Sequence, residues 1–226
     1  MNIRYLGHSC LHIQLDNYKI LVDPFISLNP LAKHIDINSI EADYIFLTHA
    51  HYDHIIDFES IANRTKALLI ANHEIVTYYG RSGIKGLAMN PGGSFQFPFG
   101  KIKMVYAAHS SSFPDGTYGG NPVGFVLQEN NGKTIYIAGD TALTLEMQLI
   151  PSFFTLDMAI LPIGGNYTMD VEEALVASQF VKCDCIMGVH FDTDPLIAID
   201  HEAAKNQFKQ LNKTLILPDI GEVIQV

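Results

Sequence analysis

The chain has 226 residues, of which 48% are hydrophobic and 17% are charged, and its formal net charge is −10 at pH 7. This length and apolar content are sufficient for one substantial core, so we expect a single domain over residues 1–226. The negative charge argues against a nucleic-acid partner, because binding to phosphates depends largely on Lys and Arg.

Three cysteines without a CxxC motif argue against both a disulfide framework and a thiolate zinc cluster. The sequence has no apolar run of about 18 residues, which a membrane span would need. It also begins without the basic and apolar regions of a signal peptide. We therefore expect a cytoplasmic protein with no membrane partner.

The predicted elements start as an antiparallel sheet and continue as alternating strands and helices. Residues 3–6, 11–15 and 18–22 are short β-like runs, and Asp16-Asn17 supplies a turn between the last two. Apolar spacing then predicts further strands at 44–48, 67–71, 101–108, 123–129, 134–138, 158–162, 185–189 and 214–226, and helices at 55–64, 74–81, 143–150, 169–181 and 202–211.

A histidine-rich stretch follows the strand predicted at 44–48. Three imidazoles and one carboxylate occur within a few residues, and this density of nitrogen and oxygen ligands is typical of a metal site. In an extended segment residues i and i+2 point the same way, so His49 and His51 can bind one ion. Asp53 and His54 face a second position. The alternative is a solvated, histidine-rich loop.

Three further candidates each follow an apolar β-like run elsewhere in the chain: His109, Asp140 and His190. Strand ends in packed sheets converge on one rim, where ligands from different loops meet. Taken singly, each has a plain structural alternative, such as an Asx turn for Asp140. The predicted set is His49, His51 and His109 for one ion and Asp53, His54 and His190 for the other, with Asp140 able to bridge both.

Seven nitrogen and oxygen ligands favour two zinc ions, while manganese, iron, cobalt and nickel remain compatible. Two such ions roughly 3.5–4 Å apart activate a bridging hydroxide for attack on an ester, lactone or phosphoester. We therefore predict a metal-dependent hydrolase in which Asp53 and Asp140 are catalytic. A metal-bound water could donate the proton to the leaving group, and His8, in the break between two strands, and Asp115 are further candidates. Ser110, Ser111 and Asp115 are candidate substrate contacts.

The motif Thr48-His49-x-His51-x-Asp53-His54, followed in order by a single His, Gly-Asp-Thr and a final His, resembles the metallo-β-lactamase superfamily. The match narrows to its uncharacterised metal-dependent hydrolases, related to lactonases such as ascorbate-6-phosphate lactonase. The segments that narrow it are Gly7-His8-Ser9-Cys10, Asp23-Pro24-Phe25, 109–116, Tyr118-Gly119-Gly120 and Pro162-Ile163-Gly164.

This resemblance covers nearly the whole chain and implies an α+β fold, the αββα sandwich, in which two packed β-sheets are flanked by helices. It also implies a dinuclear hydrolase site, with the metal roles given above at the matching positions. The chain departs from the family pattern at Gly165, where an acidic residue is usual, and at Phe191-Asp192, where Tyr-Asn is usual.

Two rival functions remain open at this point. One is a phosphodiesterase acting on a small nucleotide or RNA, although the acidic balance of the chain disfavours RNA. The other is a non-hydrolytic di-iron binding or redox protein, for which a site richer in carboxylates would be expected. The partner we expect is a small-molecule substrate, and the apolar loop 25–31 is compatible with a homo-oligomer.

Overall fold

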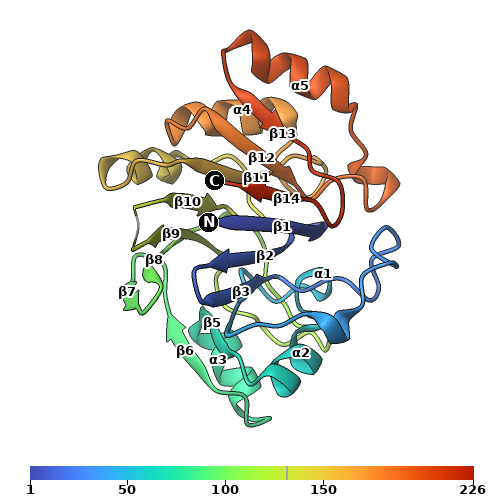
Figure 1. Ribbon diagram of the computed structural model, residues 1–226, viewed down its shortest axis with the longest axis vertical. Helices are drawn as coiled ribbons and strands as arrows, with labels where there is room; N and C mark the ends of the chain where they lie inside the picture. The colour runs from blue at the N-terminus through green and yellow to red at the C-terminus, as the bar shows by residue number, and fades with distance from the viewer. Residues whose placement is uncertain (131) are drawn as a thin grey trace.

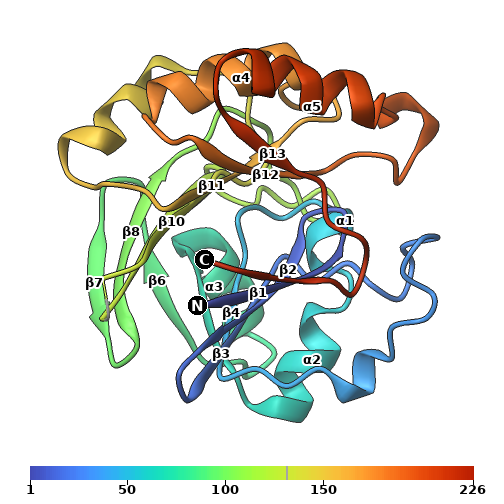
Figure 2. The same cartoon turned by 45° about the horizontal axis from the view of Figure 1, so that its top comes forward.

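The computed structural model describes residues 1–130 and 132–226, and in this part of the chain the strands form two seven-stranded sheets. The first sheet has the order β14-β1-β2-β3-β4-β5-β6 and the second β13-β12-β11-β10-β9-β8-β7. Helices α1, α2 and α3 lie outside the first sheet, and α4 and α5 cover the second (Figure 2). The predicted αββα sandwich is therefore confirmed.

The strands of the first sheet are β1 (Asn2–Gly7), β2 (Cys10–Leu15), β3 (Tyr18–Val22), β4 (Tyr44–Phe46), β5 (Leu68–Asn72), β6 (Gly86–Met89) and β14 (Val223–Gln225). Those of the second are β7 (Ser94–Phe97), β8 (Gly100–Tyr106), β9 (Val123–Glu129), β10 (Thr134–Ile137), β11 (Met158–Pro162), β12 (Cys185–Val189) and β13 (Thr214–Ile216). The helices are α1 (Tyr52–Ile55), α2 (Phe58–Thr65), α3 (His73–Gly80), α4 (Val171–Phe180) and α5 (His201–Gln210), with 3-10 segments η1 (Ile37–Ser39), η2 (Leu145–Ser152) and η3 (Pro195–Ile197).

Each sheet is antiparallel in one part and parallel in the other. In the first sheet β1, β2 and β3 pair antiparallel, whereas β3 to β6 pair parallel. In the second, β7 to β10 are antiparallel and β10 to β13 are parallel. Strand β14 returns the C-terminus beside β1 (Figure 1). The carboxyl ends of the parallel strands bring their loops to one edge of the sandwich.

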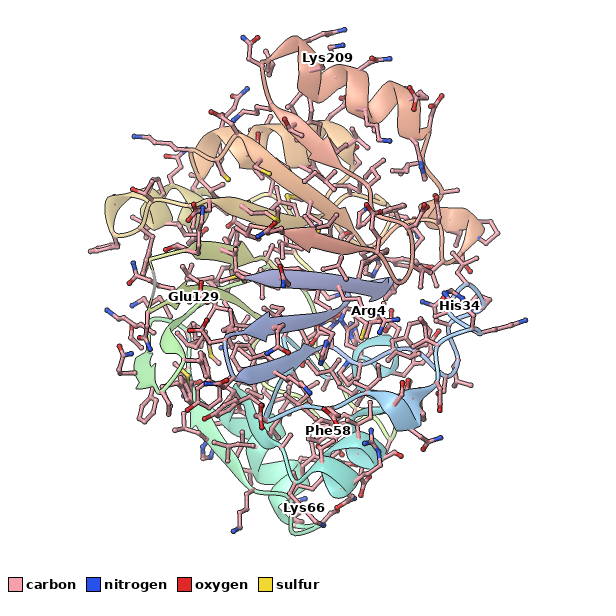
Figure 3. All side chains as sticks on the ribbon, viewed as in Figure 1. Arg4, His34, Phe58, Lys66, Glu129 and Lys209 are labelled. Carbon is pink, nitrogen blue, oxygen red and sulfur yellow. The ribbon has the colours of Figure 1, made fainter. Side chains whose placement is uncertain are left out.

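Apolar side chains fill the space between the sheets and the space under the helices. Phe46 of β4 and Phe125 of β9 meet across the sandwich, with ring centroids 5.0 Å apart. Phe58, the first residue of α2, is fully buried against the outer face of the first sheet; Figure 3 labels its position. Because both faces of each sheet are close-packed, the strand ends are held in fixed positions, and so are the site residues that follow them.

Several predicted elements differ from those observed. The helix predicted at 143–150 is the 3-10 segment η2, which contains Pro151. The helix predicted at 55–64 is α2, which begins only at Phe58, whereas Ile55 ends the short helix α1. The strand predicted at 214–226 divides into β13 and β14, which belong to different sheets. Helix α4 is capped by Asp170, whose side chain accepts from Glu173 N. None of the described helices combines the length and apolarity needed to cross a membrane.

Candidate metal centre

The seven predicted ligands come together at the edge of the sandwich where the parallel strands end. The stretch 48–54 follows β4 and enters α1, while His109, Asp140 and His190 follow β8, β10 and β12. Backbone contacts tie the two sheets together here, because His190 N donates to His8 O at 2.8 Å. Both residues have left-handed φ angles, 55° for His8 and 56° for His190, so each sits in a sharp turn.

The first cluster consists of His49, His51 and His109, whose ligand atoms lie within 4.8 Å of one another. His49 Nε2 and His51 Nδ1 are 3.0 Å apart, as the alternation of an extended segment predicts. His49 is fully buried, whereas 14% of the His109 side chain is exposed. This cluster is therefore closed on the protein side and open toward solvent.

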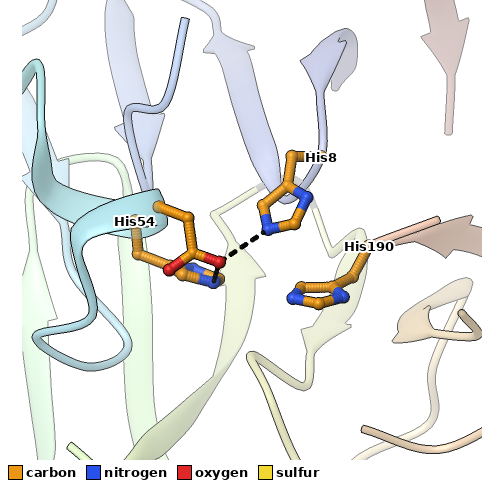
Figure 4. Close-up of side chains that lie close together, drawn as sticks. His8, His54 and His190 are labelled. Atoms are coloured by element: carbon orange, nitrogen blue, oxygen red, sulfur yellow. Dashed lines mark hydrogen bonds and ion pairs between the residues drawn. The ribbon is translucent and has the colours of Figure 1, made fainter. Parts of the chain in front are cut away.

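The second cluster consists of His8, Asp53, His54 and His190, with ligand atoms again within 4.8 Å of one another. Figure 4 shows His8, His54 and His190 turned toward a common centre. His8 Nε2 lies 3.1 Å from Asp53 Oδ2, and His8 Nδ1 lies 3.1 Å from Thr193 Oγ1. Because a carboxylate only accepts, the His8 ring donates from Nε2 to Asp53.

Asp140 lies between the two clusters. Its Oδ2 is 3.0 Å from His190 Nε2 and 3.3 Å from His54 Nε2 in the second cluster. The same oxygen is 3.9 Å from His49 Nε2 and 3.7 Å from His109 Nε2 in the first. One carboxylate oxygen thus faces histidines of both clusters.

The turn that presents Asp140 requires glycine before it. Gly139 has a φ of +66°, and a Cβ there would lie 2.8 Å from Val123 O and 2.9 Å from Thr48 Cβ. Both the positive φ and the close approach exclude larger side chains. The Gly-Asp pair therefore brings the carboxylate directly against the start of the histidine-rich stretch.

Asp23 is a buried carboxylate that orients a histidine in each cluster. Its Oδ2 accepts from Thr48 Oγ1 at 2.6 Å and from His54 Nδ1 at 2.9 Å. Since the Thr48 hydroxyl donates to Asp23, it accepts from His49 Nδ1, which is 3.0 Å away. Both imidazoles are thus protonated at Nδ1, and their Nε2 atoms point into the site.

Burial and charge set the protonation of the site. Burial lowers the pKa of His49 well below its usual value, and the neighbouring His54 adds to this effect. Burial also acts to lower the pKa of His54, but the carboxylates of Asp140 and Asp23 outweigh it and hold that pKa well above its usual value. For Asp140 burial opposes ionisation, yet His190 and His54 hold its pKa well below the ordinary range.

Burial, reinforced by His190, lowers the pKa of His8 to about 4, so its ring is neutral at pH 7. For Asp53 burial acts to raise the pKa, but the hydrogen bond from His8 and the charge of His54 outweigh it and lower that pKa. The second cluster therefore contains an ionised carboxylate of its own.

The residues present fit a pair of divalent cations. All the donors are imidazole nitrogens and carboxylate oxygens, the ligand types that zinc and related ions take. Among the described residues, three buried polar atoms of the site have no well-aligned hydrogen-bond partner: His54 Nε2, which faces Asp140 Oδ2 at 3.3 Å, Asp140 Oδ1 and His190 Nδ1. Leaving such atoms unpaired costs about 1–3 kcal/mol each. A bound cation would satisfy His54 Nε2 and Asp140 Oδ1.

A cleft of about 1000 Å³ opens onto both clusters and is lined by residues of several loops. Ser110 lines it, with Oγ 3.3 Å from His51 Nε2. Ser111, also predicted to contact substrate, is instead buried, and its Oγ accepts from Ala50 N at 3.2 Å.

Asp115, another predicted substrate contact, does not line the cleft. Its carboxylate accepts from Thr117 N and from the Tyr78 hydroxyl on the protein surface. Three residues near the site were given no role from the sequence: Asp23, Thr193 and Tyr167. For Asp23 a signal was present, because Asp-Pro directly after a strand holds a carboxylate at the sheet end.

Comparison with known proteins supplies the family. Residues 2–190 match the family model described as Beta-lactamase superfamily domain. A UPF0173 metal-dependent hydrolase of Flavobacterium johnsoniae is 55% identical over 226 residues, which are 100% of each chain. Another, from Thermus thermophilus, is 43% identical over 90% of this chain and 89% of its own.

A solved structure agrees with this assignment. Igni18, a novel metallo hydrolase from the hyperthermophilic archaeon Ignicoccus hospitalis, superimposes with a TM-score of 0.89 at 34% sequence identity. The superposition covers 99% of this chain and 97% of that one.

Proposed function

Because this chain belongs to the β-lactamase superfamily, among its metal-dependent hydrolases, we propose that it works as one dinuclear hydrolase domain acting on a small ester, lactone or phosphoester. The observation that carries the proposal is the position of Asp140, with one oxygen within 3.9 Å of histidines from both clusters. A carboxylate in this place is suited to bridging two ions, and the all-nitrogen and oxygen donor set favours zinc.

Two divalent ions bound here would supply a nucleophile at neutral pH and polarise the bond to be hydrolysed. The residues of the chain position the metal-binding side chains. Asp140 holds the two halves of the site together, and Asp23 fixes the ring orientation of His49 and His54. Ser110 contacts His51 at the mouth of the cleft.

We assign His8 a positioning role. Both of its ring nitrogens are engaged, one with Asp53 and the other with Thr193, and the ring is neutral at pH 7. Its hydrogen bond therefore holds the Asp53 carboxylate in place beside His54 and His190, the other members of the second cluster. Asp115 is not among the residues that line the cleft, so we do not assign it the role of proton donor.

The test is a pH-stat hydrolysis panel of lactones, simple esters, β-lactams and phosphodiesters. Zinc-loaded and manganese-loaded protein are compared with chelator-treated protein. Chelator-sensitive proton release from one class supports the proposal and identifies the reaction. Turnover that survives complete metal removal, or none of any class with two metals bound, would contradict it. Predominant iron with an optical charge-transfer band would favour the di-iron alternative.

A further inference from the structure

The walls of the cleft differ in chemistry from the metal-binding end. Away from the two clusters, the lining consists largely of apolar and aromatic side chains contributed by loops of both sheets. Such walls take up apolar groups, and polar atoms at one end set the orientation. The apolar and aromatic side chains are Phe25, Leu28, Pro30, Tyr52, Phe113, Pro114, Tyr167 and Ile197.

Three of these side chains expose apolar surface that a ligand would cover. Leu28 is 61% exposed, Tyr52 56% and Tyr167 53%. Phe25 packs edge-on against Tyr52, with centroids 6.0 Å apart, so this side of the cleft is preformed. Large apolar side chains exposed together around a concave site mark a binding surface.

The same walls carry no positive charge. None of the described residues lining the cleft is Lys or Arg, and outside the two clusters and Asp140 the charged side chain among them is Asp194. Asp194 Oδ1 accepts from Leu196 N at 2.9 Å, so it already occupies the amide at the start of η3. Lys66 and Lys209 lie at opposite ends of the molecule (Figure 3). Phosphate recognition normally relies on Arg, Lys or free backbone amides.

We infer that the cleft takes an uncharged ester or lactone bearing an apolar group, and that it discriminates against substrates with an anionic group remote from the reacting carbonyl. The inference rests on the proposed function, because that function places the reacting carbonyl at the two clusters. A distal carboxylate or phosphate would lose water against Leu28 and Tyr52 without meeting a cation. It would also be repelled by Asp194.

Three esters with one leaving group and one chain length test this directly. They are the p-nitrophenyl esters of hexanoate, of 6-aminohexanoate and of adipate, whose distal ends are neutral, cationic and anionic. With zinc-loaded protein we expect kcat/KM for hexanoate to exceed that for adipate by at least roughly tenfold. Equal or higher kcat/KM for adipate, or a preference for 6-aminohexanoate over hexanoate, would overturn the inference.

A charge placed on the apolar wall sharpens the test. Leu28→Lys should lower kcat/KM for the hexanoate ester and raise it for the adipate ester, narrowing their ratio several-fold. The control is Leu149→Lys on η2, because Leu149 is 62% exposed, as Leu28 is, but lies outside the cleft. The control should keep the wild-type ratio. An unchanged ratio in Leu28→Lys would contradict recognition by this wall.

A binding measurement separates this inference from the proposed function. Isothermal titration of zinc-loaded protein with hexanohydroxamate and with its ω-carboxylate compares the same two distal ends without turnover. Absence of hydrolysis for all three esters counts against the proposed function. In that case tighter binding of the neutral hydroxamate still supports the inference, and tighter binding of the ω-carboxylate refutes it.

Discussion

The two clusters share Asp140 and Asp23 but differ in charge and enclosure. The first cluster consists of three histidines and reaches solvent through His109. The second includes Asp53 and is enclosed by His8 and Thr193. A site with its own carboxylate attracts a cation more strongly than one of neutral imidazoles. We therefore expect the second cluster to fill first and the first cluster to exchange its ion more readily.

The largest effect should come from Asp140, since both clusters depend on it. Asp140→Ala is expected to lower kcat/KM by roughly 10³-fold, about 4 kcal/mol, and to reduce the bound metal. Metal analysis and pH-stat turnover measure this. Asp140→Asn is the matched variant, because it keeps the shape and removes the charge. Wild-type turnover and metal content in either variant would show that neither cluster depends on Asp140.

The next comparison separates the clusters directly. His51→Ala should leave one ion per chain after dialysis, held by the second cluster, while His54→Ala should lose affinity at both because its ring also faces Asp140. Metal content by inductively coupled plasma mass spectrometry reads this out. If His54→Ala instead kept the more firmly bound ion, the first cluster would be the tighter metal site, contrary to our expectation.

Asp23→Asn tests whether one carboxylate orients histidines in both clusters. Losing a partner behind a ligand typically costs 10–100-fold in metal affinity, and we expect a loss in that range at each cluster. Competition with a chelating dye measures the affinities. Asp57→Asn is the control, because Asp57 is also a buried carboxylate but accepts from Ile26 N and Ser27 N, outside the clusters. Equal losses in the two variants would mean that the effect is general destabilisation.

The smallest effect is expected at His8. Its hydrogen bond to Asp53 is worth about 1 kcal/mol, so His8→Ala should weaken metal binding roughly fivefold at the second cluster alone. His8→Asn retains a donor and should restore part of the loss. Titration of each variant with zinc provides the measurement, and a loss confined to kcat with normal zinc affinity would instead favour a proton-transfer role.

The αββα sandwich could be predicted because the ligand motifs and their order resemble the metallo-β-lactamase superfamily, whereas the individual strands and helices depend on local signals. Strands and helices follow from apolar spacing, and the carboxyl ends of strands identify His49, His109, Asp140 and His190 as neighbours. The separation of 214–226 into two strands was not predictable in this way, since β13 and β14 pair with different sheets and pairing is a long-range property.

The parts of the site that were not predicted depend on contacts between distant residues. The contact of Asp23 with Thr48 and His54 is made only when β3 and β4 lie side by side. Asp115 was predicted from the sequence as a substrate contact. In the structure its carboxylate accepts a hydrogen bond from the Tyr78 hydroxyl on α3 and lies outside the cleft. The metal-binding roles of the seven ligands stay predictions until an ion is observed.

The most direct test of the shared site is native mass spectrometry of metal-free protein titrated with zinc. We predict two zinc ions on the wild-type chain, taken up in two steps of different affinity. We also predict one ion on His51→Ala and a weakened uptake of both ions on Asp140→Ala. A single zinc ion at saturation of the wild type, or two ions of undiminished affinity on Asp140→Ala, would contradict a dinuclear centre organised around this carboxylate.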